Sequence, residues 1–352
     1  MYGAIAMEGA RIKENSDLDC LRGGSPVRVL KLLFVLIVLA AAAVAFLFLV
    51  PYGPSSEQFV DVAPGTGTLT IGKQLKQAGI LRTGYELEAL RITRGGTLKA
   101  GEYRFDHPAT PMEIYERMHR GDIYTIALVI PEGYNIFDIA GAVQAAGLDS
   151  SAKFLAAERQ HTELISAWSP QAPSLEGFLF PDTYKFNHHS TEEQMLGAMV
   201  KRFAEVATRL QINPADAKRV VTMASLVERE VRVKTERPLV AGVFENRIRA
   251  GMPLQTDPSV IYASLLNGTW TGVIHQSELH SASEYNTYTH AGLPPGPICN
   301  PGLAALQAAL HPAQTDFMYF VANPDGSTKF AKQLDEQNAN VAQYRHQVQP
   351  QN

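Results

Sequence analysis

The chain has 352 residues, with 31 lysines and arginines against 35 aspartates and glutamates and a formal net charge of −4. It has no block of basic residues, so we expect no nucleic-acid partner. The two cysteines, Cys20 and Cys299, lie on opposite sides of an apolar segment, which excludes an intrachain disulfide framework and a cysteine-ligated zinc site. The ten histidines lack metal-ligand spacing, so we expect neither a metal nor another cofactor.

Residues 32–50 predict one membrane-spanning helix. They carry no charge and match the roughly 20 apolar residues that cross a bilayer core. No small-residue cleavage site precedes Pro51, which favours an uncleaved anchor over a signal peptide. Arg22, Arg28 and Lys31 precede the span, whereas residues 51–72 contain no lysine or arginine. The positive-inside rule therefore places a tail of residues 1–31 in the cytoplasm and the rest of the chain outside it.

A linker and a small module are predicted next. Residues 51–58 are rich in proline, glycine and serine, as in a spacer. Residues 59–125 read as a β-α-α-β module, with strands near 59–62 and 101–105 and a helix capped by Thr110. This module is either a plain spacer or a LysM-like carbohydrate-binding module, and the motif favours neither.

Residues 126–348 predict a larger α+β domain, followed by a tail at 349–352. A strand at 126–130 and a helix repeat the pattern that opens the small module, and helices dominate beyond residue 190. Strands at 318–322 and 328–331 predict a hairpin. Four side chains are expected to cap helices, three of them directly before a proline; these are Asn213, Asp257, Asn300 and Thr235.

Two glutamates close the helix that opens at Pro214. At 100° per residue, Glu230 shares the face of Leu226 and Met223, whereas Glu228 points nearly the opposite way. A carboxyl group on an apolar face is desolvated, which raises its pKa and allows it to act as a general acid near neutral pH. For a glutamate taken alone, a salt bridge with a nearby arginine at the helix end is the more common explanation.

Several downstream and upstream segments carry the side chains that bind sugars. Sugar recognition needs planar rings for stacking and amide or carboxylate groups for hydroxyls. The candidate substrate-binding residues are Gln255, Asp257, Tyr285, Asn286, Tyr288, Glu176 and Phe178. Together these residues predict a glycan cleft.

Long ordered motifs resemble those of the endolytic murein transglycosylases, the MltG or YceG-like family. The resemblance runs from the anchor to about Tyr344. Its motifs are Glu176-Gly-Phe-Leu-Phe-Pro-Asp-Thr-Tyr, Met223-Ala-Ser-Leu-Val-Glu-Arg-Glu, Val243-Phe-Glu-Asn-Arg-Ile-Arg, Leu254-Gln-Thr-Asp-Pro-Ser-Val-Ile-Tyr, Tyr285-Asn-Thr-Tyr, Gly292-Leu-Pro-Pro-Gly-Pro-Ile and His311-Pro-Ala-x-Thr. Pro297 and Cys299 depart from the small residues expected in their loop.

The resemblance implies a lytic transglycosylase that cuts peptidoglycan strands internally between MurNAc and GlcNAc and leaves 1,6-anhydroMurNAc ends. It implies that Glu230, the second glutamate of the Glu-basic-Glu motif, is the catalytic acid. It further implies a single-pass protein of the bacterial inner membrane with an extracytoplasmic catalytic domain, which terminates nascent strands and has penicillin-binding synthases as possible partners.

Two other functions stay open. One is a muramidase, a hydrolase that uses Glu230 together with Glu228 or Asp257, because ordinary glycosidases need two carboxylates. The other is a non-catalytic glycan-binding scaffold that recruits wall synthases. Product mass separates the transglycosylase from the hydrolase, since an anhydro end is one water lighter than a reducing end.

Overall fold

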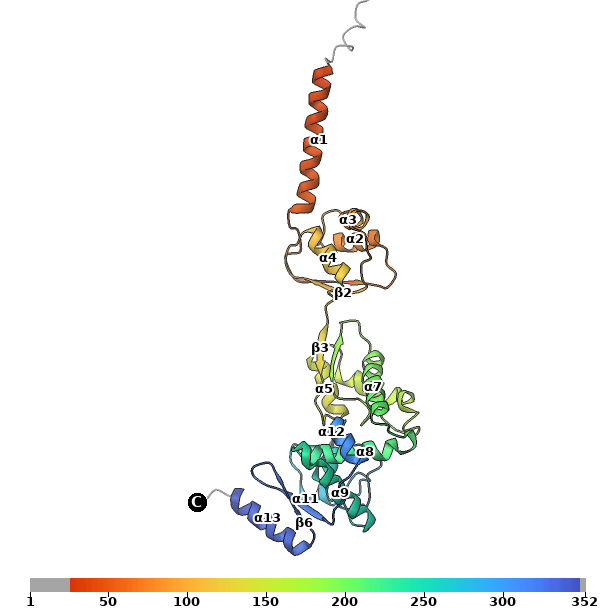
Figure 1. Ribbon diagram of the computed structural model, residues 1–352, viewed down its shortest axis with the longest axis vertical. Coiled ribbons are helices and arrows are strands. Elements are labelled where there is room, and N and C mark those ends of the chain that lie inside the picture. Colours follow the sequence, from red (N-terminus) through yellow and green to blue (C-terminus); the bar gives the residue numbers. More distant parts are fainter. Residues whose placement is uncertain (1–25, 349–352) are drawn as a thin grey trace, which may run out of the picture. The chain divides into compact units, whose positions relative to one another are not determined.

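The structure, a computed structural model, describes residues 26–348 (Figure 1). Cys20, Arg22, most of the expected cytoplasmic tail and the tail at 349–352 lie outside the described residues. Contacts divide the described chain between Tyr124 and Thr125 into two compact units.

The first unit begins with a long apolar helix, α1, at Pro26–Leu49. Its segment Val27–Leu49 has a mean hydropathy of 3.2 and is long and apolar enough to cross a membrane. Its most apolar part is not buried against the rest of the protein. The helix starts at Pro26, before the uncharged run, and so includes Arg28 and Lys31. The expected apolar helix is confirmed, and its orientation stays a prediction.

The remainder of this unit has the order β-α-α-β-α. Its elements are β1 (Gln58–Val62), α2 (Thr68–Gln77), α3 (Glu86–Arg94), β2 (Gly101–Phe105) and α4 (Pro111–Arg120). β1 and β2 pair antiparallel, with Val60 opposite Tyr103. Thr110 accepts a hydrogen bond from the Glu113 amide and forms the capping box that starts α4. The expected strands and helices are present, and α4 completes their core by burying Ile114.

The second unit is helical with two small antiparallel sheets. Its elements are β3 (Ile126–Val129), α5 (Ile136–Ala145), α6 (Ser151–Gln160), η1 (Thr162–Ile165), β4 (Thr183–Phe186), α7 (Glu192–Arg209), η2 (Pro214–Asp216), α8 (Ala217–Glu230), η3 (Lys234–Glu236), α9 (Arg237–Arg249), α10 (Asp257–Leu266), α11 (Gln276–Leu279), α12 (Leu303–Leu310), β5 (Tyr319–Ala322), β6 (Thr328–Ala331) and α13 (Leu334–Val348). β3 pairs with β4, and β5 pairs with β6. The mixed α+β class expected from the sequence is confirmed.

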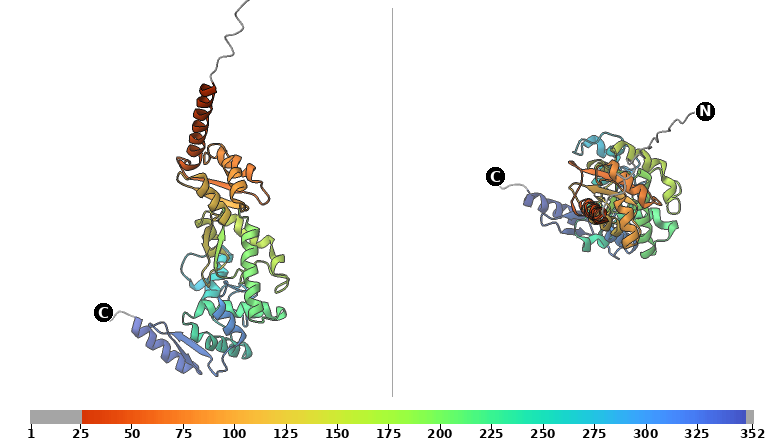
Figure 2. Two further views of the ribbon diagram at one scale, coloured as in Figure 1. Left: turned by 45° about the horizontal axis from the view of Figure 1, so that its top comes forward. Right: turned by 90° about the horizontal axis from the view of Figure 1, so that it is seen from above.

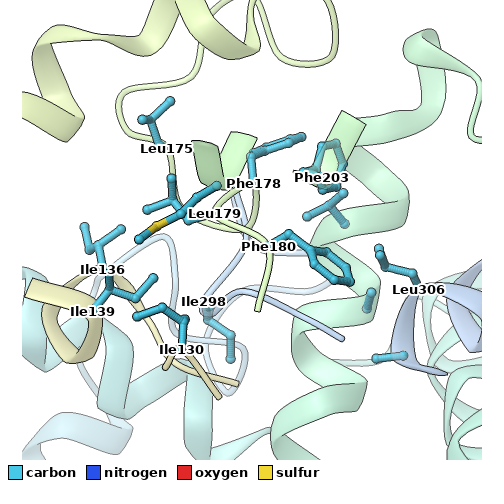
Figure 3. Close-up of a cluster of buried hydrophobic side chains, with 14 of the residues drawn as sticks. Ile130, Ile136, Ile139, Leu175, Phe178, Leu179, Phe180, Phe203, Ile298 and Leu306 are labelled. Carbon is cyan, nitrogen blue, oxygen red and sulfur yellow. The ribbon is translucent and has the colours of Figure 1, made fainter. Parts of the chain in front are cut away.

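One hydrophobic core joins distant segments of this unit. Phe178 packs edge-on against Phe203 of α7 with ring centroids 5.0 Å apart, and Leu179 and Ile139 are fully buried in the same cluster (Figure 3). α12, blue in Figure 1, lies against α8 although a long stretch of sequence separates them. The apolar face of α8 is therefore covered, and its C-terminal residues are held at a fixed place in the unit.

The residues at which helices start were predicted less accurately than the presence of the helices. Asn213 caps η2 as expected by accepting a hydrogen bond from the Ala215 amide. Asp257 is the first residue of α10 and Thr256 holds the cap position, so that prediction is one residue off. The predictions for Asn300 and Thr235 are wrong. Gly302 is at the N-cap of α12, and Thr235 lies within η3.

The predicted hairpin is present as β5 and β6, and α13 lies alongside it (Figure 2). Phe320 of β5 meets Phe244 of α9 edge-on at 5.7 Å between ring centroids. This contact holds the hairpin against the middle of α9.

Candidate active site

A cavity of about 220 Å³ opens where the C-terminus of α8 meets α9, the start of α10 and the β5–β6 hairpin. Its walls come from Glu230, Arg247, Leu254, Gln255, Asp257, Tyr288, Phe320, Val321, Ala322 and Thr328. Four of the residues expected from the sequence, Glu230, Gln255, Asp257 and Tyr288, therefore meet in one cavity.

Glu230 is the last residue of α8 and lies half-buried in the wall of this cavity. Burial, helped by the negative charge of Asp257, raises the pKa of Glu230 to about 7, and Arg247 opposes the shift. Within the described residues, the Glu230 carboxyl group has neither a hydrogen bond nor an ion pair. The salt bridge considered from the sequence is not formed, and a protonated carboxyl group is available near neutral pH.

Glu228 has a different environment one half-turn away. Its Oε1 accepts a hydrogen bond from Arg237 Nη2 at 2.5 Å, and its Oε2 accepts one from the Gly302 amide at 3.0 Å. Burial raises the pKa of Glu228, and the Arg237 guanidinium opposes the shift. Glu228 is thus a buried ion-pair partner that ties α8 to α9 and to the start of α12, and it does not line the cavity.

Asp257 and Tyr288 form a pair in the cavity wall. The Tyr288 hydroxyl donates a 2.6 Å hydrogen bond to Asp257 Oδ1. Burial and this hydrogen bond raise the pKa of Tyr288, so the phenol keeps its proton and Asp257 remains the acceptor. Asp257 is otherwise exposed and can accept hydrogen bonds from a ligand.

Gln255 lies on a strained stretch of backbone beside this pair. Its φ of +54° is in the left-handed region, which costs a residue with a Cβ roughly 1–2 kcal/mol. Two hydrogen bonds hold the backbone there. The backbone N–H of Gln255 donates to Thr287 O at 3.0 Å, and the backbone N–H of Thr256 donates to Thr287 Oγ1 at 3.0 Å. Strain maintained in this way in a cavity wall is typical of functional sites.

Glu176 and Phe178, which were expected to contact substrate, do not line this cavity and have buried side chains with structural contacts. Glu176 is buried, accepts hydrogen bonds from the Ile136 amide at 3.0 Å and from Asn300 Nδ2 at 2.9 Å, and has a pKa that burial raises to about 8. Phe178 is only 1% exposed and cannot stack on a sugar. A Cβ on Gly177, whose φ is +87°, would lie 2.4 Å from Pro297 Cγ, so this motif is shaped for packing.

Tyr285 and Asn286 also serve the scaffold. Asn286 is fully buried, and its Nδ2 donates to the carbonyl oxygens of Leu279 and Ser281 at 3.1 and 2.9 Å. Tyr285 is half-buried, and its ring packs against Tyr262 at 5.2 Å between centroids. These residues support the loop that carries Tyr288 and do not line the cavity, and a sugar contact by the half-buried Tyr285 stays a prediction.

A sequence profile of the YceG-like family matches residues 60–343. The chain belongs to the YceG-like family. The chain is 31% identical over 306 residues to a Bacillus subtilis protein named endolytic murein transglycosylase, covering 81% of this chain and 84% of the relative. A protein of the same name from Streptococcus pneumoniae is 29% identical over 331 residues, which cover 84% of this chain and 60% of that longer protein. A solved structure of a YceG-like protein from Listeria monocytogenes has a TM-score of 0.53 and 30% identity, covering 82% of this chain and all of that one.

Two parts of this YceG-like site were missed by reasoning from the sequence. Arg247 donates to Leu254 O at 2.7 Å through Nη1 and to Met318 O at 2.7 Å through Nε, which joins the loop before α10 to the hairpin. The hairpin itself contributes Phe320 and Thr328 to the cavity wall. Arg247 was visible in the motif that begins at Val243, whereas nothing in the sequence pattern indicates that the hairpin reaches the cavity.

Proposed function

We propose that this YceG-like protein is an endolytic murein transglycosylase that cleaves the β-1,4 bond between MurNAc and GlcNAc within peptidoglycan strands and leaves 1,6-anhydroMurNAc ends. The observation that carries the proposal is Glu230, a carboxyl group with a pKa raised to about 7 in the wall of a cavity that also holds an amide, a carboxylate and a phenol. The names of the Bacillus and Streptococcus relatives support the same reaction.

The chemistry follows from the state of Glu230. Protonated Glu230 donates its proton to the glycosidic oxygen as the bond from MurNAc C1 to that oxygen breaks. The resulting carboxylate then takes the proton of the C6 hydroxyl as O6 forms its bond to C1. A pKa near the working pH serves both steps, because the group must give up a proton and regain it in one turnover. Neither water nor an enzyme nucleophile is consumed.

The neighbouring residues orient the sugar. Asp257 accepts from Tyr288 and keeps lone pairs for sugar hydroxyls, and its negative charge stabilises positive charge that develops at C1. Gln255 offers an amide to the acetamido group or to a hydroxyl. Arg247 positions the loop that carries them through its hydrogen bond to Leu254 O.

The three parts of the chain have separate roles in this proposal. The apolar helix α1 anchors the chain in the bacterial inner membrane with the N-terminus in the cytoplasm, supported by the hydropathy of Val27–Leu49. Residues 59–125 act as a LysM-like module that holds glycan, supported by the β-α-α-β order. Residues 126–348 form the catalytic domain, which terminates growing strands beside penicillin-binding synthases.

A hydrolase is the second candidate, favoured by the presence of Asp257 in the same cavity as Glu230. Glu228 is a poor second carboxylate because Arg237 and the Gly302 amide occupy its oxygens. Digestion of purified glycan strands by the full chain in detergent, followed by mass spectrometry, decides between the two. Anhydro ends support the transglycosylase, ends one water heavier support the hydrolase, and binding without cleavage supports a scaffold.

A further inference from the structure

A second cavity, of about 630 Å³, lies between α5, α8, α10 and the segment that follows α10. The side chains that matter in its wall are Tyr134, Asp138, Arg229, Ile261, Leu265 and Trp270. The mechanism proposed above uses none of them. We call this surface the Trp270 groove.

The groove combines planar apolar surface with two opposite charges. Tyr134 and Trp270 are half-buried, so part of each ring stays accessible. Arg229 Nη1 donates to Gly133 O at 3.2 Å, which fixes the guanidinium and leaves it further N–H groups. Asp138 is exposed, and its Oδ2 accepts from the Asn135 amide at 3.1 Å, whereas in the described part of the chain its Oδ1 has no hydrogen bond.

This combination suits a pyranose ring. The C–H face of a sugar packs on an aromatic ring, its hydroxyls donate to a carboxylate, and an acetamido carbonyl accepts from a guanidinium. The opposite charges of Asp138 and Arg229 would also accept a zwitterionic peptide end, but a peptide gives no reason for two accessible aromatic rings. The chemistry of the groove therefore favours an amino-sugar chain.

The groove and the catalytic cavity share two helices. Arg229 of the groove directly precedes Glu230 of the cavity on α8. α10 begins with Asp257 in the cavity and passes Ile261 and Leu265 in the groove. At 1.5 Å per residue, the step from Asp257 to Leu265 is about 12 Å, which is longer than one sugar ring. The groove and the cavity therefore lie along the same helix, about 12 Å apart by this measure.

We propose that the Trp270 groove is a glycan subsite that holds the β-1,4-linked amino-sugar strand away from the bond that is cut. The proposal rests on the proposed function for the identity of the substrate. A hold on the strand at a distance from the reacting bond favours cutting within long strands, because short fragments and strand ends cannot fill both surfaces. The Trp270 groove therefore supplies preference for polymer length.

Binding at the groove can be measured without cleavage. The chain has two tryptophans, so Trp168→Phe leaves Trp270 as the single tryptophan, and Glu230→Gln slows turnover at least about a hundredfold. We expect a saturable change in Trp270 fluorescence when peptide-free GlcNAc-MurNAc strands are added to the full chain in detergent. We expect Asp138→Ala in this background to weaken binding about tenfold, which corresponds to about 1.4 kcal/mol.

Steady-state kinetics give a second measure. Trp270→Ala should raise KM for long strands about tenfold and leave kcat unchanged, because the lost contacts bind the substrate and the transition state equally. Cleavage of a tetrasaccharide should be unchanged. Trp270→Phe should restore most of the affinity. Val273→Ala is the matched control, because Val273 is 61% exposed, close in sequence and outside the groove.

Two results would overturn the subsite. One is unchanged strand binding and KM in Trp270→Ala. The other is a fluorescence response to free stem peptide with none to peptide-free strands. Failure of the proposed function gives a different result from failure of the subsite. The wild-type chain would then yield no anhydro ends, and the fluorescence titration would still show what the groove binds.

Discussion

Glu176→Gln should change how the stability of the second unit depends on pH. Glu176 is 3% exposed, and burial raises its pKa from 4.5 to about 8. The folded state therefore holds a proton that the unfolded chain releases near pH 4.5. Because the folded state binds more protons between these two values, its stability is full below about pH 4.5, falls as the pH rises and levels off above about pH 8.

The magnitude follows from the same two values. One pKa unit corresponds to about 1.4 kcal/mol, so the free energy of unfolding should fall by up to about 5 kcal/mol across this window from Glu176 alone. In the Gln variant this titration is lost. The variant should be less stable at pH 5 by about 1–3 kcal/mol, because Glu176 accepts from two N–H donors and the amide has a single oxygen to offer them.

Urea denaturation of the full chain in detergent, followed by tryptophan fluorescence, measures the difference, since Trp168 and Trp270 both lie in the second unit. The free energy of unfolding of the wild type should exceed that of the variant at pH 5. This difference should shrink or change sign by pH 8.5. A difference that stays constant from pH 5 to pH 8.5 would show that Glu176 is ionised in the folded protein, and the burial argument would fail.

Three further predictions concern catalysis and topology. The kcat/KM for strand cleavage should fall tenfold per pH unit above about pH 7, because Glu230 must be protonated to act as an acid; a pH profile flat to pH 9 would contradict this. A periplasmic reporter fused after Asn352 should be active and a cytoplasmic one inactive, and the reverse result would show an inverted anchor. Deletion of residues 59–125 with the anchor retained should keep bond cleavage but raise KM for polymeric strands, whereas loss of all cleavage by a folded deletion protein would place essential residues in the module.

Much of the fold was predictable because local signals are strong in this chain. The apolar run, the Thr110 capping box and the alternating hairpin strands each depend on residues close in sequence, and the structure has them close to the expected bounds. The cap at Asn300 failed because tertiary contacts compete for the same side-chain groups. The cap at Thr235 failed because the chain forms η3 there and α9 begins only at Arg237. Asn300 Oδ1 accepts from the Leu179 amide and its Nδ2 donates to Glu176, so this side chain joins two distant segments and does not cap α12.

The candidate site shows the same division between local and distant information. The helical period alone placed Glu230 and Glu228 on different faces, and the structure places Glu230 in the cavity wall and Glu228 in an ion pair with Arg237. The period cannot tell an accessible polar residue from a buried one, which is why Phe178 and Asn286 were expected to touch substrate although they are buried. Arg247 was missed because its role depends on the carbonyl oxygens of Leu254 and Met318, which only the folded chain brings together.

The central claim is that Glu230 is the catalytic acid, and paired substitutions test it most directly. Glu230→Gln keeps the shape of the side chain but removes its proton, and general acid catalysis contributes roughly 10² to 10⁴ in rate. Glu228→Gln, the matched control two residues away, alters a buried ion pair outside the cavity.

Mass spectrometry of glycan strands digested by each full-length variant measures the yield of anhydro ends. The account predicts that Glu230→Gln folds and binds strands but forms at most about one hundredth of the wild-type anhydro product, whereas Glu228→Gln retains substantial activity. An active Glu230→Gln together with an inactive but folded Glu228→Gln would contradict the account.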